Sequence, residues 1–194
     1  MDEIRQIILG NPNFIVETRL SINEVLSFER EYKISLPSQY RKFVTTIGKG
    51  LKYLNQTILI DFNPNNMFYP PYADSQYADQ CRINFRKDFP YTDIWNVPKI
   101  TLEEWLQQKG EDRWADDHIK YFSNDHISGT IPLRDVGCGI VEILILRGQE
   151  KGNIWMDDRY NYQGIYPLKI AQQQRADFKT WLINMIKLYT DKIV

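Results

Sequence analysis

The feature that most constrains the fold is an apolar stretch followed by a loop that glycines bound. Residues 140–146 are apolar and rich in β-branched types, and Glu142 is the one charged interruption. A run of this length and composition favours a buried central strand over a helix. Gly148 and Gly152 bound a short polar loop, after which residues 153–157 predict a returning strand. Two strands joined by such a loop form a β-hairpin, so the rest of the chain has to cover this hairpin.

Three helices are predicted ahead of the hairpin. An amphipathic pattern over residues 2–9 predicts the first. Ser21 and Glu24 have the spacing of a capping box, which predicts the start of the second. Pro37 breaks the chain after that helix and suits the first turn of a third. The side chains expected to face the core are Ile4, Ile7 and Ile8, then Ile22, Val25, Leu26, Phe28 and Tyr32, then Tyr40, Phe43, Val44 and Ile47.

Short strands and a closing helix complete the predicted order. Residues 51–62 suggest one or two strands, and residues 119–122, 129–133 and 164–168 suggest further strands. An apolar stripe at helical spacing predicts the closing helix, and it is formed by Phe178, Trp181, Leu182, Met185, Ile186 and Tyr189. This order predicts a single α+β domain over residues 1–194, with a central, mostly antiparallel sheet and helices packed on one side.

A long segment over residues 63–118 interrupts this order, and it is rich in proline, tyrosine, phenylalanine and asparagine. Within it, residues 101–108 predict a short helix, because Thr101 and Glu104 have capping-box spacing and Gly110 follows. Loops of this length inside a compact domain are usually functional or mobile. The aromatic content of the segment predicts that it packs against the domain.

Composition narrows the classes of partner. The formal net charge of −1 argues against a general nucleic-acid binder, since that binding depends on many lysines and arginines facing phosphates. The first residues lack the basic and apolar regions of a signal peptide, and no apolar run approaches the ~20 residues that span a bilayer. Cys81 and Cys138 are the only cysteines and suggest no disulfide framework. We expect a soluble, cytoplasmic protein without nucleic-acid or membrane partners.

The histidines suggest one candidate metal site. His118 and His126 are the two histidines of the chain, and Asp116, Asp117 and Asp125 lie near them in the sequence. Neutral imidazoles and carboxylates bind zinc and similar ions, but this spacing matches no recognised ligand motif. A solvated acidic loop is the better interpretation, because clustered charges often have only a structural role. We expect no bound metal and no cofactor, and a metal-dependent enzyme is the weakest functional alternative.

Two further groups could carry chemistry. Cys138 stands between Gly137 and Gly139 and could be a nucleophile at a turn, but no base lies near it in the sequence. A small buried thiol at the start of the strand is the expectation. Asp157 and Asp158 could act as paired carboxylates at an exposed strand end, although adjacent aspartates there usually serve turn chemistry. We predict no catalytic residue and a protein that is not an enzyme.

The order of these motifs resembles the SUKH superfamily, which includes the Smi/Knr regulators of fungal cell-wall synthesis and many bacterial proteins. Over residues 20–62 and 119–190, the similar positions are Phe28-Glu29, Ile34, Leu36-Pro37, Tyr40, Arg41 and Phe43, then Gly137, Gly139, Gly148, Gly152 and Trp155, then Asp177 to Leu182. The resemblance implies a binding fold without catalytic residues. Its signature positions are expected to be mainly structural, and here they are Leu36, Pro37, Gly139, Gly148, Trp155 and Trp181.

Bacterial members of this superfamily commonly serve as immunity proteins that neutralise a toxin from the same gene neighbourhood, often a nuclease. The resemblance therefore implies a cognate toxin as partner, and a general regulatory interaction module of the Smi/Knr type is the alternative. An acidic surface could face a basic nuclease cleft, where charge complementarity speeds association. The aromatic segment could add anchors. The residues predicted to bind the partner are Glu111, Asp112, Asp116, Asp117, Asp125, Asp157 and Asp158.

Overall fold

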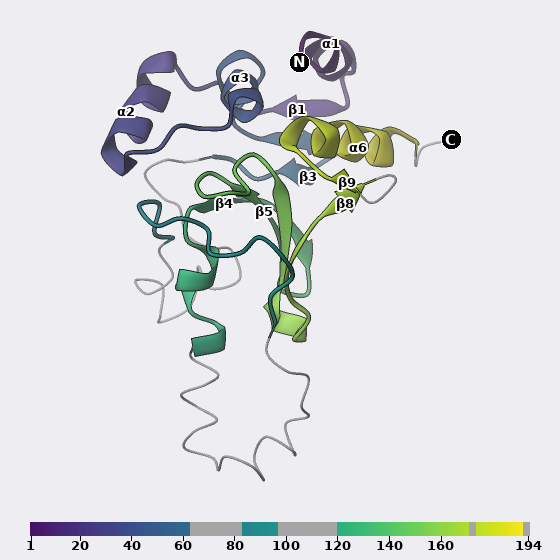
Figure 1. The fold of residues 1–194 in the computed structure, drawn as a ribbon. Helices are drawn as coiled ribbons and strands as arrows, with labels where there is room; N and C mark the ends of the chain where they lie inside the picture. Colours follow the sequence, from purple (N-terminus) through teal and green to yellow (C-terminus); the bar gives the residue numbers. More distant parts are fainter. Residues whose placement is uncertain (63–82, 97–119, 171–173, 192–194) are drawn as a thin grey trace.

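The chain has the predicted α+β fold. A computed structural model describes residues 1–62, 83–96, 120–170 and 174–191, which are coloured in Figure 1. Helices and antiparallel sheets share one cluster of buried apolar side chains, which runs from Ile4 near the amino terminus to Ile186 in the last helix. None of the helices in these ranges combines the length and the apolar character needed to cross a membrane. The helix predicted over residues 101–108 lies outside the described residues.

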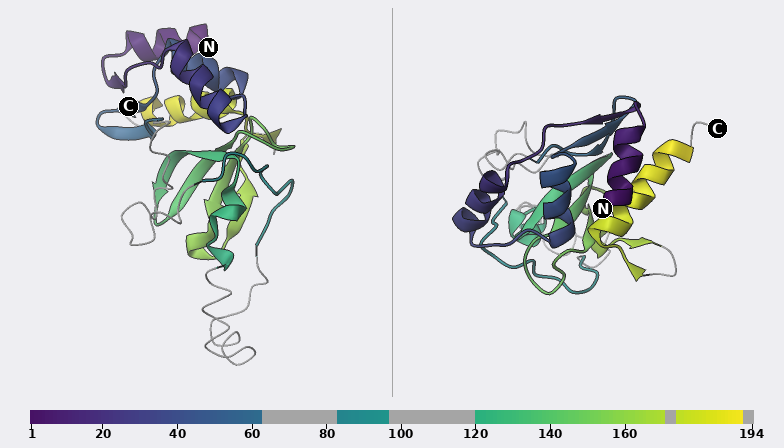
Figure 2. Two further views of the ribbon diagram at one scale, coloured as in Figure 1. Left: turned by 90° about the vertical axis from the view of Figure 1, so that its left-hand side faces the viewer. Right: turned by 90° about the horizontal axis from the view of Figure 1, so that it is seen from above.

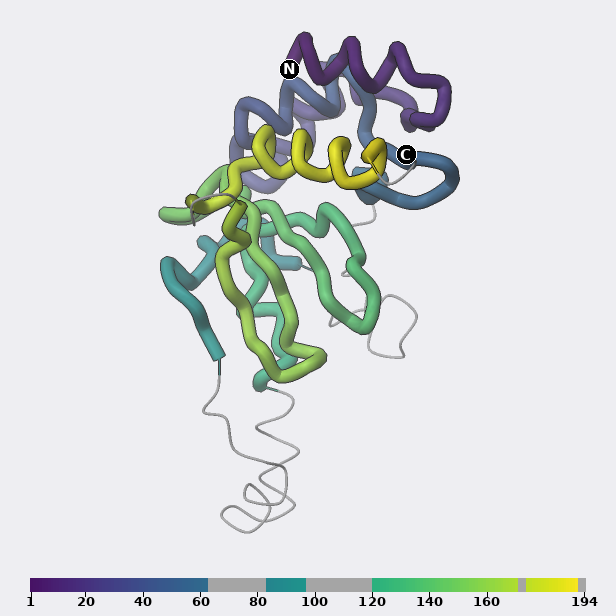
Figure 3. Tube along the Cα trace, turned by 90° about the vertical axis from the view of Figure 1, so that its right-hand side faces the viewer, coloured from purple at the N-terminus to yellow at the C-terminus, as the bar shows by residue number. Residues whose placement is uncertain are grey.

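The helices gather on one side of the strands, as predicted (Figure 2), and the last helix lies across the strand ends (Figure 3). They are α1 (Asp2–Gly10), α2 (Ile22–Tyr32), α3 (Ser38–Thr46) and α6 (Phe178–Thr190). The capping box of α2 is confirmed, because Ser21 Oγ accepts from the Glu24 N–H at 3.2 Å and Glu24 Oε2 accepts from the Ser21 N–H at 2.7 Å. Asp177 caps α6 by accepting from the Thr180 N–H at 2.8 Å. These local bonds fix where both helices begin.

Helix α2 buries only part of the face that its apolar pattern predicts, with Val25 and Phe28 in the core. The side chains predicted to be buried but found exposed are Ile7 on α1 and Ile22 and Leu26 on α2. In their place, the acidic Glu29 takes a buried position on α2. Arg41 on α3 pairs with Glu29, and the backbone N–H of Leu36 donates to Glu29 Oε1 at 2.6 Å. These partners compensate the buried carboxylate, so the position of the helix depends on an ion pair as well as on apolar contacts.

Two antiparallel sheets carry most of the strands, with the orders β1-β2-β3 and β4-β5-β6-β7. The strands are β1 (Phe14–Val16), β2 (Leu51–Tyr53), β3 (Gln56–Leu59), β4 (Thr130–Gly137), β5 (Ile140–Ile145), β6 (Ile154–Asp158) and β7 (Gly164–Pro167), with a small ribbon of β8 (Lys169–Ile170) and β9 (Gln174–Arg175). A backbone hydrogen bond of 2.7 Å from Ile60 to Leu133 brings the end of the first sheet against β4. The strand predicted over residues 119–122 is wrong for its described part, because residues 120 and 121 are helical.

The predicted hairpin is confirmed as β5–β6, and a second hairpin precedes it. Gly137 and Ile140 pair across β4 and β5, so Cys138 and Gly139 form a two-residue turn. Both have positive φ angles, 52° and 74°, which is the type I′ geometry that matches the twist of the flanking strands. The expectation of a buried Cys138 thiol is therefore wrong, because the tip of this turn is exposed. The ring of Tyr160 lies against Gly139, where a Cβ would be 2.4 Å from it.

The two faces of the second sheet are covered by different kinds of structure. Cross-strand partners share a face, so Val141, Ile143, Trp155 and Asp157 lie on one side, and Glu142, Leu144, Ile154 and Met156 lie on the other. Helix α6 covers the second side, where the Trp181 indole N–H donates to Glu142 Oε2 at 2.9 Å. We call this side the helix-covered face. The first side, the aromatic face, packs against the loop residues 83–96 and the short helical turns of residues 120–127, for example through Phe89 on Trp155.

Candidate functional site

Of the predicted partner-binding residues that the structure describes, one is exposed and two are buried. Asp125, in the short 3₁₀ helix η3 (Asn124–Ile127), is exposed and pairs with Lys87 at 2.8 Å. Asp157 and Asp158 are both buried, so the expectation of an exposed carboxylate pair at this strand end is wrong. A buried carboxylate cannot contact a partner directly, and these two instead support the residues around them. Lying outside the described residues are Glu111, Asp112, Asp116 and Asp117.

Asp157 is buried because Arg159 binds it. The guanidinium donates from Nε to Oδ1 at 2.8 Å and from Nη2 to Oδ2 at 2.7 Å, a bidentate geometry. Its Nη1 donates to the backbone carbonyls of Tyr121 at 3.0 Å and Ser123 at 2.9 Å. A buried ion pair is tolerated only where further hydrogen bonds satisfy its charged groups. Arg159 thus ties the short helix η4 (Arg159–Asn161), which follows β6, to the segment that covers the aromatic face.

Asp158 has a separate set of partners in the same turn. Asn161 Nδ2 donates to Oδ1 at 2.7 Å, and the Tyr166 hydroxyl donates to Oδ2 at 3.3 Å. Burial, together with this neighbouring carboxylate, raises the pKa of Tyr166 to about 12. The contact with Asn161 fits the turn chemistry predicted for the aspartate pair.

Stacked rings form a column that runs from the aromatic face to the surface. We call Tyr91, Trp95, His126, Tyr121 and Tyr162 the aromatic column. Trp95 stacks on Tyr91 at a centroid distance of 5.2 Å, on His126 at 4.1 Å and on Tyr121 at 5.5 Å. Tyr121 then stacks on Tyr162 at 5.7 Å, with their planes 9° apart. Burial raises the pKa of Tyr91 and of Tyr121 to about 12.

His126 is held within this column by both ring nitrogens. Its Nε2 lies 2.9 Å from the Lys120 carbonyl, which can only accept, so Nε2 carries the hydrogen and Nδ1 accepts from the Tyr91 hydroxyl. Burial lowers the pKa of His126, which favours this neutral form. In the part of the chain that the structure describes, no three His, Cys, Asp or Glu side chains gather as a metal site would require. The other histidine, His118, lies outside that part.

One end of the second sheet carries exposed apolar and aromatic side chains, spread from β4 at one edge to the segment beside β7 at the other, and we call it the aromatic end. Its members are Ile94 (65% exposed), Val136 (42%), Tyr160 (59%) and Tyr162 (51%). Hydrogen bonds join the segments that carry them: Asn96 Nδ2 donates to the Tyr162 carbonyl at 2.8 Å, and Asn161 Nδ2 donates to the Cys138 carbonyl at 3.4 Å. Exposed apolar groups gathered on a well-ordered support are typical of interaction sites.

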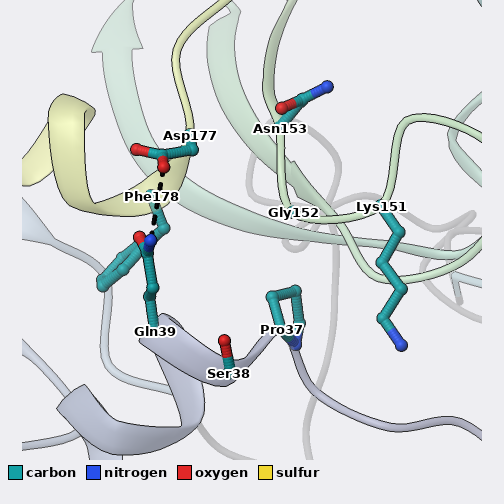
Figure 4. A pocket seen from close by; sticks show the side chains of 8 residues that line it. All are labelled: Pro37, Ser38, Gln39, Lys151, Gly152, Asn153, Asp177 and Phe178. Carbon is teal, nitrogen blue, oxygen red and sulfur yellow. Dashed lines mark hydrogen bonds between the residues drawn. The ribbon is translucent and has the colours of Figure 1, made fainter.

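A second candidate region is an open pocket of about 350 Å³ beside the β5–β6 loop, at the other end of the second sheet from the aromatic end, and Figure 4 shows the residues that line it. It is lined by Pro37, Ser38, Gln39, Lys151, Gly152, Asn153, Asp177 and Phe178. Gln39 of α3 joins this helix to the start of α6, because its Nε2 donates to Asp177 at 3.3 Å and its Oε1 accepts from the Lys179 N–H at 2.9 Å. Burial acts to raise the pKa of Asp177, but its hydrogen bonds with Thr180 and Gln39 outweigh burial and lower it.

The pocket lies where the three blocks of the SUKH resemblance meet, since Pro37, Gly152 and Phe178 come from one block each. In Figure 4 the Lys151 side chain turns away from Asp177, and its amine donates to Ser35 Oγ at 2.6 Å. The polar groups of the pocket are thus used to join α3, the β5–β6 loop and α6. Its lining residues include neither a histidine that could act as a general base nor a cysteine that could act as a nucleophile.

The other signature positions of the resemblance lie mainly in the interior or in tight turns. Leu36, Trp155 and Trp181 are buried, and Gly139 and Gly148 have positive φ angles. Comparisons of the chain with protein-family models, with curated proteins and with solved structures found no match. The function therefore has to be inferred from the residues of this chain.

Sequence reasoning missed the residues that organise the aromatic face. Arg159 follows the aspartate pair directly, and an arginine beside two acidic residues at a strand end is a signal for ion pairing. Tyr162 looks like an ordinary loop tyrosine, because its stacking partner Tyr121 is remote in the sequence. The prediction that the long aromatic segment packs against the domain is confirmed for its described residues 83–96, which bury Phe89 over Trp155.

Proposed function

We propose that this chain is an immunity protein of the SUKH type, which binds a cognate bacterial toxin and thereby neutralises it. The observation that carries the proposal is the aromatic end, in particular exposed Tyr160 and Tyr162. Tyrosine is enriched among the residues that dominate binding energy, because it buries a large amphipathic ring and fixes only two torsion angles. A cluster of such side chains supports a role in recognising another protein.

The support beneath the aromatic end favours binding. Arg159, the first residue of η4, is anchored by its hydrogen bond to Asp157. Tyr162 is held by stacking on Tyr121 and by the hydrogen bond from Asn96 to its carbonyl. Ordering a flexible side chain on association costs about 0.5–1.5 kcal/mol, and a side chain that is already held avoids much of this cost. The aromatic end is therefore preorganised for a partner.

In this proposal the chain acts by covering the toxin, in the cytoplasm and without chemistry of its own. A stable protein–protein interface needs roughly 800 Å² from each partner, so the aromatic end would form its centre and neighbouring polar residues its rim. Asp125 is the exposed member of the predicted binding residues within the described part of the chain, and in this proposal it belongs to that rim.

Co-expression tests the proposal. Each protein encoded beside this chain is expressed in a bacterial host alone and together with the chain, and growth is compared. We expect one of these neighbours to carry a toxin domain that stops growth, and we expect the chain to restore growth. A tagged chain should also pull down an inactive variant of the toxin domain as a stoichiometric complex. If growth is not restored and no complex forms, the proposal is wrong.

A further inference from the structure

Two separate segments lie over the aromatic face, and we call residues 83–96 and 120–127 together the cover. Its buried residues are Ile83, Phe85, Phe89, Tyr121 and Ile127, and the rest are exposed or half-buried. In β5, by contrast, five of the six residues are buried. Each ordered residue loses about 1–2 kcal/mol of backbone conformational entropy, which buried apolar area has to offset. A segment with sparse burial therefore opens at a lower free energy than a core strand.

Three arginines from outside the cover hold it at separate points. Arg175 Nη2 donates to the Thr92 carbonyl at 2.6 Å, and Arg147 Nε donates to Asp88 Oδ1 at 2.5 Å. Arg159 donates to two carbonyls of the second segment at 3.0 and 2.9 Å. A pair of backbone hydrogen bonds of 2.8 and 2.9 Å joins the first segment to β7. The cover is thus attached at points, whereas β5 is paired along its length on both sides.

His126 joins the two segments of the cover. It belongs to the second segment, yet its Nδ1 accepts from the Tyr91 hydroxyl and its ring stacks on Trp95 at 4.1 Å, both in the first segment. An ion pair of 2.8 Å between Lys87 and Asp125 adds a further link. Because the segments bind each other, opening of one removes support from the other.

From the sparse burial, the point attachments and this joint, we propose that the cover opens as one unit while the sheets and helices stay folded, and that protonation of His126 favours the open form. The open form takes the aromatic end apart, because Ile94 is part of the cover. Tyr162 also loses its support, since it stacks on Tyr121 and its carbonyl accepts from Asn96. The cover therefore acts as an acid-sensitive switch of this surface.

The direction of the pH effect follows from the hydrogen bonds of His126. In the closed cover, Nε2 donates to the Lys120 carbonyl at 2.9 Å and Nδ1 accepts from Tyr91, so a second proton has to reverse the bond with Tyr91. Burial lowers the pKa of His126 in the closed form, whereas an exposed imidazole titrates near pH 6.5. The open form binds more protons below that pH, so the cover opens more readily as the pH falls. The titratable and charged residues that face His126 are Tyr91, Lys120, Asp125 with its partner Lys87, Asp157 and Arg159.

Hydrogen exchange of the purified full-length protein, followed by mass spectrometry in rising urea, tests the single opening unit. Peptides that span residues 83–96 and 120–127 should share one protection factor and one dependence on urea. Their protection should be at least about tenfold lower than that of a peptide spanning residues 140–146. The opening unit is wrong if all three peptides open in one event, or if the two segments of the cover open in different events.

The same measurement at pH 7.5 and pH 5.5 tests the role of His126. After correction for the intrinsic exchange rate, protection of the cover should fall about threefold in the wild type. His126→Gln keeps hydrogen-bonding groups, and His126→Phe keeps a ring on Trp95. Neither side chain titrates, so both variants should lose this fall, whatever their stability. A fall as large as that of the wild type in either variant would overturn the role of His126. Exchange requires no partner, so these outcomes are independent of the proposed function.

Discussion

The two faces of the second sheet each bury a carboxylate–arginine pair, but they hold it in different ways. On the helix-covered face, Arg134 of β4 binds Glu142 of the neighbouring β5 at 2.8 and 3.2 Å, and Trp181 of α6 donates to the same carboxylate. On the aromatic face, Arg159 binds Asp157 and also reaches the carbonyls of the segment that covers the sheet. The Arg134 side chain is 14% exposed, and that of Arg159 is 2% exposed.

This difference follows from what covers each face. A helix satisfies its own backbone groups, so α6 can cover a sheet with side chains alone. Residues 120–127 form only short helical turns, so some of their carbonyls need donors from elsewhere. Arg159 supplies donors to Tyr121 and Ser123. A loop-covered face thus depends on one side chain where a helix-covered face does not.

The largest expected effect is the loss of Arg159. Arg159→Met should lower the free energy of unfolding by about 3–5 kcal/mol, because Asp157 would remain buried without its partner. Urea unfolding followed by circular dichroism measures it. Arg147→Met is the matched control: this arginine pairs with Asp88 on the surface, so its loss should cost less than about 1 kcal/mol. Equal costs for the two variants would contradict the importance of Arg159.

On the helix-covered face we expect a smaller loss. Glu142→Gln keeps an acceptor for the Trp181 indole but removes the charge that pairs with Arg134, which can still reach solvent. The free energy of unfolding should fall by about 1–3 kcal/mol. The same urea titration measures it. A loss as large as that of Arg159→Met would show that the two faces depend equally on their ion pairs.

Loss of the N-cap of α6 should lower the free energy of unfolding by less than either of these changes. Asp177→Ala removes the acceptor for the Thr180 N–H and should cost about 1 kcal/mol, the usual value for an N-cap. Asp177→Ser keeps a capping oxygen and should recover most of that loss. Thermal unfolding of the two variants, run side by side, provides the comparison. If serine recovers nothing, the bond from Gln39 is the more important role of Asp177.

The smallest expected effect is a dependence of the free energy of unfolding on pH, which comes from His126 on the aromatic face. The pKa of His126 in the folded chain lies below its usual value, so the unfolded chain binds more protons as the pH falls below about 6.5. Stability should therefore decrease from pH 7.5 to pH 5.5, and His126→Gln should show a shallower decrease. The groups that face His126 are Tyr91, Trp95, Lys120, Asp125, Asp157 and Arg159. Identical slopes for the two proteins in urea titrations at both pH values would contradict this.

The helices and the β5–β6 hairpin could be predicted from the sequence because their signals are local. The capping box of Ser21 and Glu24 spans three residues, and the stripe of α6 repeats every turn. The hairpin β5–β6 also carries its own glycine-bounded loop. Glu142 was visible as a charge in an apolar strand, but its partner Arg134 follows only from the register of β4 on β5.

The aromatic face could not be predicted in the same way, because its contacts join distant parts of the chain. Arg159 reaches Tyr121 across 38 residues, and Trp95 pairs with Ile165 across the edge of β7. Periodicity says nothing about such pairs. The wrong expectation for Cys138 has a local cause, since a residue followed by glycine between two apolar runs indicates a hairpin turn as well as a strand start.

The contact between Gly139 and Tyr160 has a consequence for how this sequence can change. Any side chain at position 139 would collide with the ring at 160, and the positive φ angle already disfavours one. Among related sequences, a larger residue at 139 should therefore be accompanied by a smaller residue at 160. The tip of the β4–β5 hairpin and an exposed ring proposed to meet the partner would then covary, so that a change of binding specificity at position 160 would require a compatible residue at position 139.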